Sequence, residues 1–246
     1  MRFVAVDIGN SKTRLGLFQD AALQTAHSIP TDKHSTVDLL LQHYRDVFQE
    51  DITDLPLFVA SVVPTLSHVL RDEVTLIHHE SPLNFEIKRI QANTLGADII
   101  AGSQAAVRFY QIPAIVIDAG TATTVTYINK EKAFLGGVIC PGLGISAKAL
   151  FEQTSALDPV DLVIPPSVIA HTTEHAIQGG LMFGHAGMIT SLVERIKKEE
   201  QLDAVSVLCT GGVSHALLPL LPQDYIFDPE LVLKGIASIA MNHYTH

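Results

Sequence analysis

The chain has 246 residues, of which 47% are hydrophobic and 17% are charged, so it is too apolar for a disordered protein. Its 16 basic and 26 acidic residues give a net charge of −10, which disfavours binding to nucleic acid or membrane surfaces through positive charge. No apolar run reaches the ~18 residues of a membrane span, no secretory signal opens the chain, and its 2 cysteines cannot form a disulfide framework. We therefore expect a cytoplasmic protein of one large or two modest domains.

Strand-like apolar runs alternate with helical patterns, which predicts an α/β fold. In the first half the pattern predicts strands at 3–6, 14–18 and 57–63 and helices at 37–48 and 97–110. In the second half it predicts strands at 116–118, 124–128, 134–140 and 205–208 and helices at 172–198 and 231–243.

One pattern occurs twice: an apolar strand, then Asp-x-Gly, then small polar residues. It appears at 4–11 and again at 116–121, and its aspartates, Asp7 and Asp118, lie 111 positions apart. A second strand candidate follows each copy. This repetition predicts two duplicated halves, and we place the domains at 1–112 and 113–246.

The first copy has the composition of an anion-binding turn. Gly9 permits a tight turn and a close backbone approach, and the polar residues 10–13 can donate to phosphate oxygens. Asp7 can hold Mg²⁺ or its water shell. An ordinary hairpin with an Asn-containing turn is the alternative.

The second half contains three more segments in which glycine or small residues would let the backbone approach a ligand closely. Residues 118–124 repeat the devices of the first turn, although a Thr-rich strand start would look the same. The Gly-rich segment 136–144 lacks the Gly-Lys-Ser/Thr ending of a Walker A loop. Thr210-Gly211-Gly212 is suited to a nucleoside lying against the backbone, or to a plain strand-to-helix turn.

Asp98 lies at the start of the helix predicted at 97–110. A carboxylate near a phosphate site can accept the proton of an attacking hydroxyl. The commoner use of an aspartate at this position is structural, as a helix cap or first-turn residue.

The order of these motifs resembles that of the type III pantothenate kinases, bacterial enzymes of the actin, sugar kinase and Hsp70 superfamily. The resemblance covers nearly the whole chain and rests on seven segments in order: 7–11, 61–64, 96–98, 118–124, 136–142, 173–180 and 210–212. It implies two duplicated RNase H-like (actin-like ATPase) domains, each with a mixed sheet flanked by helices, enclosing a cleft. The implied activity is the ATP-dependent phosphorylation of pantothenate to 4'-phosphopantothenate, the first step of coenzyme A biosynthesis.

The resemblance also implies roles for individual residues. The ATP-binding set is one loop and one threonine: Asp7, Ile8, Gly9, Asn10, Ser11, Lys12, Thr13, Arg14 and Thr121. The pantothenate-binding set is Gly96, Ala97, Asp98, Ile99 and Thr173. Asp98 would be the general base, and Asp118 would bind the activating K⁺ or NH₄⁺, with Mg²⁺ accompanying ATP. Thr173 would act at the interface of a homodimer.

Three positions depart from the family pattern. Ile99 replaces an arginine after the Gly-x-Asp motif, Arg89 replaces a tyrosine, and Thr126 replaces an aspartate. Losing the arginine removes a donor suited to a carboxylate or an amide, and Arg89 is a candidate to restore the positive charge. Two alternatives therefore stand beside the pantothenate kinase: a kinase for another small hydroxylated acceptor, and a non-catalytic nucleotide-binding transcriptional accessory protein.

Overall fold

The computed structural model describes residues 1–49, 52 and 54–245, and they form two compact units. Unit 1 comprises Met1–Tyr110, Lys132–Phe134 and Glu230–His246, and unit 2 comprises Gln111–Glu131 and Leu135–Pro229. The first crossing between units, after residue 110, lies near the predicted boundary at 112. The structure differs from the prediction at the C-terminus, because residues 230–246 belong to unit 1.

Unit 1 is built on a five-stranded mixed sheet in the order β3-β2-β1-β4-β5. Its strands are β1 (Arg2–Ile8), β2 (Lys12–Gln19), β3 (Ala22–Pro30), β4 (Leu57–Ser61) and β5 (Thr75–Leu76). β1 pairs antiparallel with β2 and parallel with β4, so it occupies the centre of the sheet. The sequence prediction included β1, β2 and β4 but not β3 or β5.

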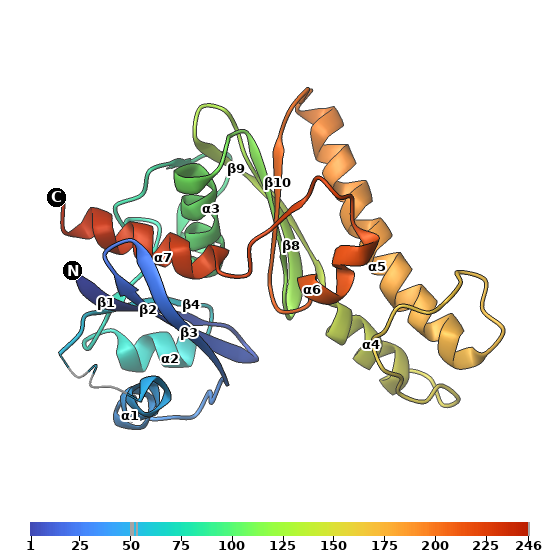
Figure 1. The fold of residues 1–246 in the computed structure, drawn as a ribbon, viewed down its shortest axis with the longest axis horizontal. Coiled ribbons are helices and arrows are strands. Elements are labelled where there is room, and N and C mark those ends of the chain that lie inside the picture. Colours follow the sequence, from blue (N-terminus) through green and yellow to red (C-terminus); the bar gives the residue numbers. More distant parts are fainter. Residues whose placement is uncertain (50–51, 53, 246) are drawn as a thin grey trace. The chain divides into compact units, whose positions relative to one another are not determined.

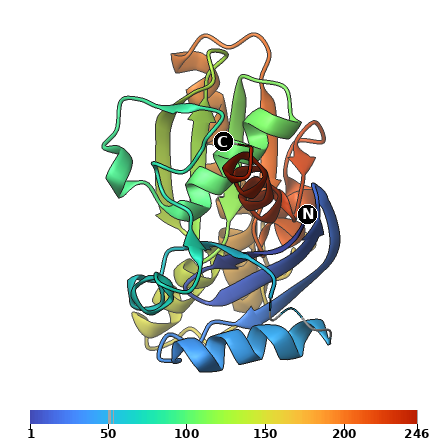
Figure 2. The ribbon, with the colours of Figure 1, turned by 90° about the vertical axis from the view of Figure 1, so that its left-hand side faces the viewer.

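Helices cover both faces of this sheet (Figures 1 and 2). They are α1 (Val37–Phe48), α2 (Pro64–Leu70), α3 (Ala97–Phe109) and α7 (Leu231–His243). Alternate residues of β1 explain the two layers: Val4 and Val6 join the core with α1 and α2, whereas Phe3 stacks on Phe18 and meets Phe58 on the opposite face. Both strand faces are therefore apolar and buried.

The last helix belongs to unit 1 because it packs closely on α3 and on the strands β1, β2 and β4. Gly235 makes the close approach possible, since a Cβ atom there would collide with the Ala101 backbone of α3. A division of the chain into two consecutive halves could not anticipate this return.

Unit 2 has the same central pattern. Its strands are β7 (Ala114–Ala119), β8 (Ala122–Ile128), β9 (Ala133–Pro141), β10 (Ser206–Thr210) and β11 (Ile226–Phe227), in the order β11-β10-β7-β8-β9. The first residues of β9 lie in unit 1, where they pair with the short strand β6 (Glu86–Ile87). β7 pairs antiparallel with β8 and parallel with β10, as β1 does with β2 and β4.

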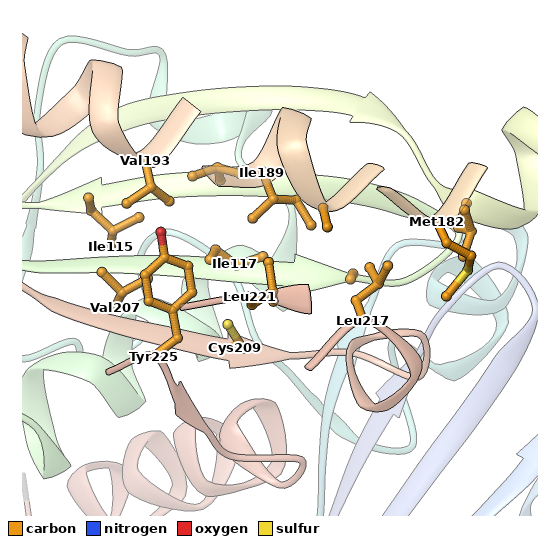
Figure 3. Close-up of a cluster of buried hydrophobic side chains, with 14 of the residues drawn as sticks. Ile115, Ile117, Met182, Ile189, Val193, Val207, Cys209, Leu217, Leu221 and Tyr225 are labelled. Atoms are coloured by element: carbon orange, nitrogen blue, oxygen red, sulfur yellow. The ribbon is translucent and has the colours of Figure 1, made fainter. Parts of the chain in front are cut away.

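One face of this sheet packs against α4 (Leu143–Glu152), the 27-residue α5 (Thr173–Glu199) and α6 (Ser214–Leu217). Figure 3 shows the core between them, where Ile189 and Val193 of α5 meet Ile115 and Ile117 of β7. Burial of these side chains supplies the main stabilising contribution to the unit.

The two units therefore repeat one design, and the predicted class of duplicated α/β units with mixed sheets flanked by helices is confirmed. Strand for strand, β3-β2-β1-β4-β5 corresponds to β9-β8-β7-β10-β11. Among the described residues, no helix combines the length and the apolar character needed to cross a bilayer.

Candidate functional site

The turn between β1 and β2 is tight and carries exposed polar groups. The Gly9 amide donates to the Lys12 carbonyl oxygen at 3.0 Å. Thr31, just beyond β3, donates its hydroxyl to the Gly9 carbonyl at 2.8 Å and lies 2.9 Å from the Thr13 hydroxyl. These hydrogen bonds fix the base of the turn, and residues 10–12 are exposed at its tip. Ordered backbone and side-chain donors of this kind are suited to an anion.

Arg14 and Asp7 lie directly opposite each other on β2 and β1. The Arg14 guanidinium is also ion-paired with Glu230, the residue before α7, with 2.7 Å between Nη2 and Oε2. The predicted phosphate loop thus ends in a cation that already has a carboxylate partner. Sequence reasoning missed Glu230 because it lies 216 positions away.

Asp98 occupies the first turn of α3, which begins after the N-cap residue Gly96. Its carboxylate accepts a hydrogen bond from the Ile99 amide at 2.7 Å. The carboxylate folds back over Gly96, where an added Cβ would lie 2.5 Å from Oδ1. Burial raises the pKa of the Asp98 carboxyl, whereas the hydrogen bond donated by the Ile99 amide lowers it to a smaller extent. The group is a partly buried carboxylate that holds a proton more readily than an exposed one.

The turn after β1 and the start of α3 are linked through the segment after β4. Ile8 lies beside Ser61 in the parallel ladder, and the Val62 amide donates to the Ile8 carbonyl at 3.0 Å. Val62 in turn faces Gly96, since a Cβ on that glycine would lie 3.6 Å from Val62 Cγ1. Unit 1 therefore brings together three segments singled out in the sequence: 7–14, 61–64 and 96–98.

A second convergence occurs in unit 2, around Asp118 at the end of β7. The Asp118 carboxylate lies against Gly211, which has a φ of +94°, and near Gly120. The Val213 amide donates to the Ala119 carbonyl at 2.9 Å, which fixes the segment after β10 beside the turn. Glycine is required at 211 because its backbone conformation and the adjacent carboxylate both disfavour a side chain.

The Gly-rich segment 136–144 reaches the same turn. Gly142 lies against the carbonyl oxygens of Gly120 and Thr121, and a Cβ there would overlap both. Carboxylate and carbonyl oxygens are the donors that hard cations prefer. Among the residues that the structure describes, no cluster of three or more His, Cys, Asp or Glu side chains exists for a metal ion.

Thr173 is apart from this turn within unit 2. It is the exposed first residue of α5, behind the N-cap Thr172, whose hydroxyl accepts from the His175 amide. His185 of the same helix meets Thr123 at 2.9 Å, and Thr173 precedes it by twelve residues, or ~18 Å of helix. Thr173 is therefore remote from the Asp118 turn.

The two departures at substrate positions lie in unit 1. At position 99 the backbone amide donates the hydrogen bond to Asp98. Isoleucine in place of the family's arginine therefore leaves that hydrogen bond intact. Arg89 is exposed and has a φ of 64°. Thr31 is a further residue that sequence reasoning missed, since an isolated threonine after an unpredicted strand carries no signal.

A separate cavity of about 360 Å³ in unit 1 lies between the end of β3 and α1. Thr13, Leu40 and Tyr44 contribute to its lining, whereas Asp7 and Asp98 do not. It is distinct from the carboxylates described above.

Solved structures with the same fold include proteins of different activities. A Baf family protein from Campylobacter jejuni, described as a transcriptional activator, is 22% identical with a TM-score of 0.68, covering 99% of this chain and 100% of its own. The activator of 2-hydroxyisocaproyl-CoA dehydratase from Clostridium difficile, with bound ADPNP, is 13% identical with a TM-score of 0.62, covering 100% and 96%. A ROK hexokinase from Thermus thermophilus is 14% identical with a TM-score of 0.51, covering 97% and 98%. At these identities the likeness establishes the actin-like ATPase fold.

The family follows from the sequence match rather than from the fold. The family model of the type III pantothenate kinases matches residues 3–195. That span contains the β1–β2 turn, the start of α3 and the Asp118 turn. The chain therefore belongs to the type III pantothenate kinase family.

Proposed function

We propose that this protein transfers a phosphoryl group from ATP to the hydroxyl of pantothenate, giving 4'-phosphopantothenate. Family membership supports this reaction, and Asp98 is the observation that carries it. A partly buried carboxylate with a raised pKa, held at a helix start near the first Asp-x-Gly turn, has the properties of a general base.

Asp98 accepts the proton of the pantothenate hydroxyl as the oxygen attacks the γ-phosphorus. The Ile99 amide holds one carboxylate oxygen, which leaves the other to face the substrate. In phosphoryl transfer the protein contributes mainly positioning and charge stabilisation, so orientation of this carboxylate matters more than its basicity.

The ATP phosphates are bound by residues 7–14. The exposed groups at the tip of the turn donate hydrogen bonds, and Arg14 supplies a positive charge from β2. The related dehydratase activator holds ADPNP, which supports nucleotide binding by this fold. Thr121, exposed on the second Asp-x-Gly turn, is a further ATP contact.

The cations fit the oxygen donors of both turns. Asp118, with the neighbouring carbonyls of Gly120 and Thr121, has the donor chemistry for K⁺ or NH₄⁺. Asp7 is suited to Mg²⁺, which is usually bound by one or two carboxylates together with substrate phosphates. When bound, these cations neutralise charge that develops on the phosphoryl oxygens.

A second candidate keeps the kinase chemistry and changes the acceptor. Ile99 stands where the family has arginine, so a donor for the acceptor's polar groups is missing at that position. The exposed Arg89 supplies a cation elsewhere in unit 1. The acceptor would then be another small hydroxylated acid or amide.

We propose that the protein acts as a homodimer in which α5 lies at the interface and Thr173 contacts pantothenate. Three glycines at helical spacing, Gly180, Gly184 and Gly187, are exposed on α5 with nothing within 4 Å of an added Cβ. Each glycine costs a helix ~1 kcal/mol relative to alanine. Close approach of a second helix offsets this cost, because glycine permits short interhelical distances.

The dimer is tested by sedimentation equilibrium. Gly184→Leu places a large side chain among the three exposed glycines of α5 and shifts the protein toward the monomer. Glu199→Leu, at the exposed end of the same helix, is the control and leaves the mass unchanged. A wild-type protein that is monomeric at micromolar concentration contradicts the proposal.

The reaction is tested by ADP release from Mg·ATP with pantothenate, with and without K⁺. We expect K⁺-dependent turnover that Asp98→Asn reduces by at least about 100-fold, since general bases contribute ~10²–10⁴-fold. Absence of turnover with ATP binding intact points to a different acceptor or to a regulatory protein, and turnover with other hydroxylated acids separates these two.

A further inference from the structure

The Arg14–Glu230 ion pair joins the strand after the phosphate turn to the start of α7. Nη2 and Oε2 lie 2.7 Å apart, and both side chains are about one-quarter exposed (28% and 25%). The pair is thus partly shielded from water, which strengthens the attraction relative to an exposed pair. Arg14 belongs to the loop proposed to bind ATP phosphates.

Glu230 sits at an unexpected place for a pairing residue. It occupies the N-cap position of α7, yet its side chain makes no capping hydrogen bond to that helix. Its carboxylate instead accepts a hydrogen bond from Arg14 on β2. Glu230 is also the residue at which the chain returns from unit 2 to unit 1. The Glu230 side chain therefore pairs with Arg14 and does not cap its own helix.

A phosphate and a carboxylate seek the same guanidinium geometry. Arginine binds either anion through parallel N–H donors. Glu230 occupies part of this donor set and places a negative charge beside the position that a polyphosphate would take. Binding of ATP must then either displace Glu230 or overcome its repulsion.

We propose that Glu230 competes with the ATP phosphates for Arg14 and thereby weakens nucleotide binding. Nucleotide phosphate takes over Arg14 from Glu230 when ATP binds. The inference rests on the proposed function, because it assumes that Arg14 contacts the phosphates.

Calorimetric titration of the full chain with ATP tests the competition. Glu230→Gln keeps the size of the side chain and removes its charge. We expect the Kd for ATP to fall by about two- to five-fold, the range that a partly exposed ion pair supports. The Kd for adenosine, which carries no phosphate, stays unchanged. Glu199→Gln changes the net charge equally in unit 2 and leaves the Kd for ATP unchanged.

A double-mutant cycle with Arg14→Gln separates competition from simple repulsion. In the Arg14→Gln background, Glu230→Gln has no further effect on the Kd for ATP if Glu230 acts through Arg14. Equal tightening in both backgrounds, or unchanged or weaker ATP binding by Glu230→Gln alone, overturns the inference. If Glu230→Gln melts near the titration temperature, Glu230→Asp, which draws the carboxylate away from Arg14, is titrated with the same expectation to a smaller degree.

The two proposals fail differently. A wild-type protein that binds no ATP overturns the proposed function. ATP binding by the wild type that is insensitive to Glu230→Gln overturns the competition and leaves the kinase proposal standing.

Discussion

Replacement of Gly211 by alanine tests the convergence of segments at Asp118. Gly211 has a φ of +94°, and an added Cβ would overlap the Asp118 carboxylate and lie 2.6 Å from the carbonyl atoms of Ala119. The left-handed backbone costs a non-glycine residue ~1–2 kcal/mol, and overpacking costs ~1–3 kcal/mol. We therefore expect Gly211→Ala to lower the free energy of unfolding by about 2–5 kcal/mol.

The adjacent glycine provides the matched control. Gly212 has nothing within 4 Å of an added Cβ, so Gly212→Ala leaves stability within ~0.5 kcal/mol of the wild type. In a chain of this size ~2–4 °C of Tm corresponds to 1 kcal/mol, so Gly211→Ala lowers the Tm by at least about 4 °C. Thermal unfolding followed by circular dichroism measures the difference.

Gly211→Ala also has a functional consequence under the proposed mechanism. The new methyl group displaces the Asp118 carboxylate, so more K⁺ is required for half-maximal activity, whereas Gly212→Ala keeps the wild-type requirement. Equal Tm values for the two variants would refute the packing described around Asp118.

Three further substitutions test other parts of the structure. Asp98→Asn reduces turnover by at least about 100-fold and raises the Tm at pH 7. Because burial raises the pKa of this carboxyl above its unfolded value, stability is lost as the pH rises from the unfolded pKa through the folded pKa. The Tm gain therefore disappears in melts at a pH below the unfolded pKa of ~3.9, and a wild-type kcat/KM that does not fall as the pH is lowered toward ~3.9 contradicts the base assignment. Gly235→Ala forces α7 away from α3 and lowers stability by ~1–3 kcal/mol in urea unfolding, whereas Gly144→Ala, in open space, does not destabilise. Thr31→Val removes the hydroxyl bond to the Gly9 carbonyl and raises the KM for ATP several-fold with a loss of ~1 kcal/mol of stability; an unchanged KM counts against the turn as the phosphate site.

The central strands and long helices could be predicted because their apolar patterns are local. α1 and α7 have the predicted bounds, Val37–Phe48 and Leu231–His243, since their apolar residues recur at helical spacing. β3 was missed because its half-exposed residues mix with polar ones, and β5 and β11 have two residues each, too few for any periodicity.

Candidate site residues could be named from the sequence where they lie in contiguous segments. The two Asp-x-Gly turns and Asp98 stood out because each combines suitable residue types within a few positions of sequence, and their roles stay predictions. Glu230 and Thr31 were not, since their roles arise from pairing across the fold. The packing of α7 on α3 likewise depends on the approach of Gly235 to Ala101, which no local pattern records.

The two duplicated turns differ in the residue that lies opposite their aspartate. Asp7 and Asp118 occupy equivalent positions, each on the central strand of its sheet and each opposite one residue of the following antiparallel strand. In unit 1 that residue is Arg14, a cation, and in unit 2 it is Thr124, which is uncharged. A turn with its own arginine favours an anion, whereas a carboxylate among carbonyls favours a cation. The same fold element thus places a cation opposite its aspartate in unit 1, where Glu230 pairs with that cation, and an uncharged threonine opposite its aspartate in unit 2.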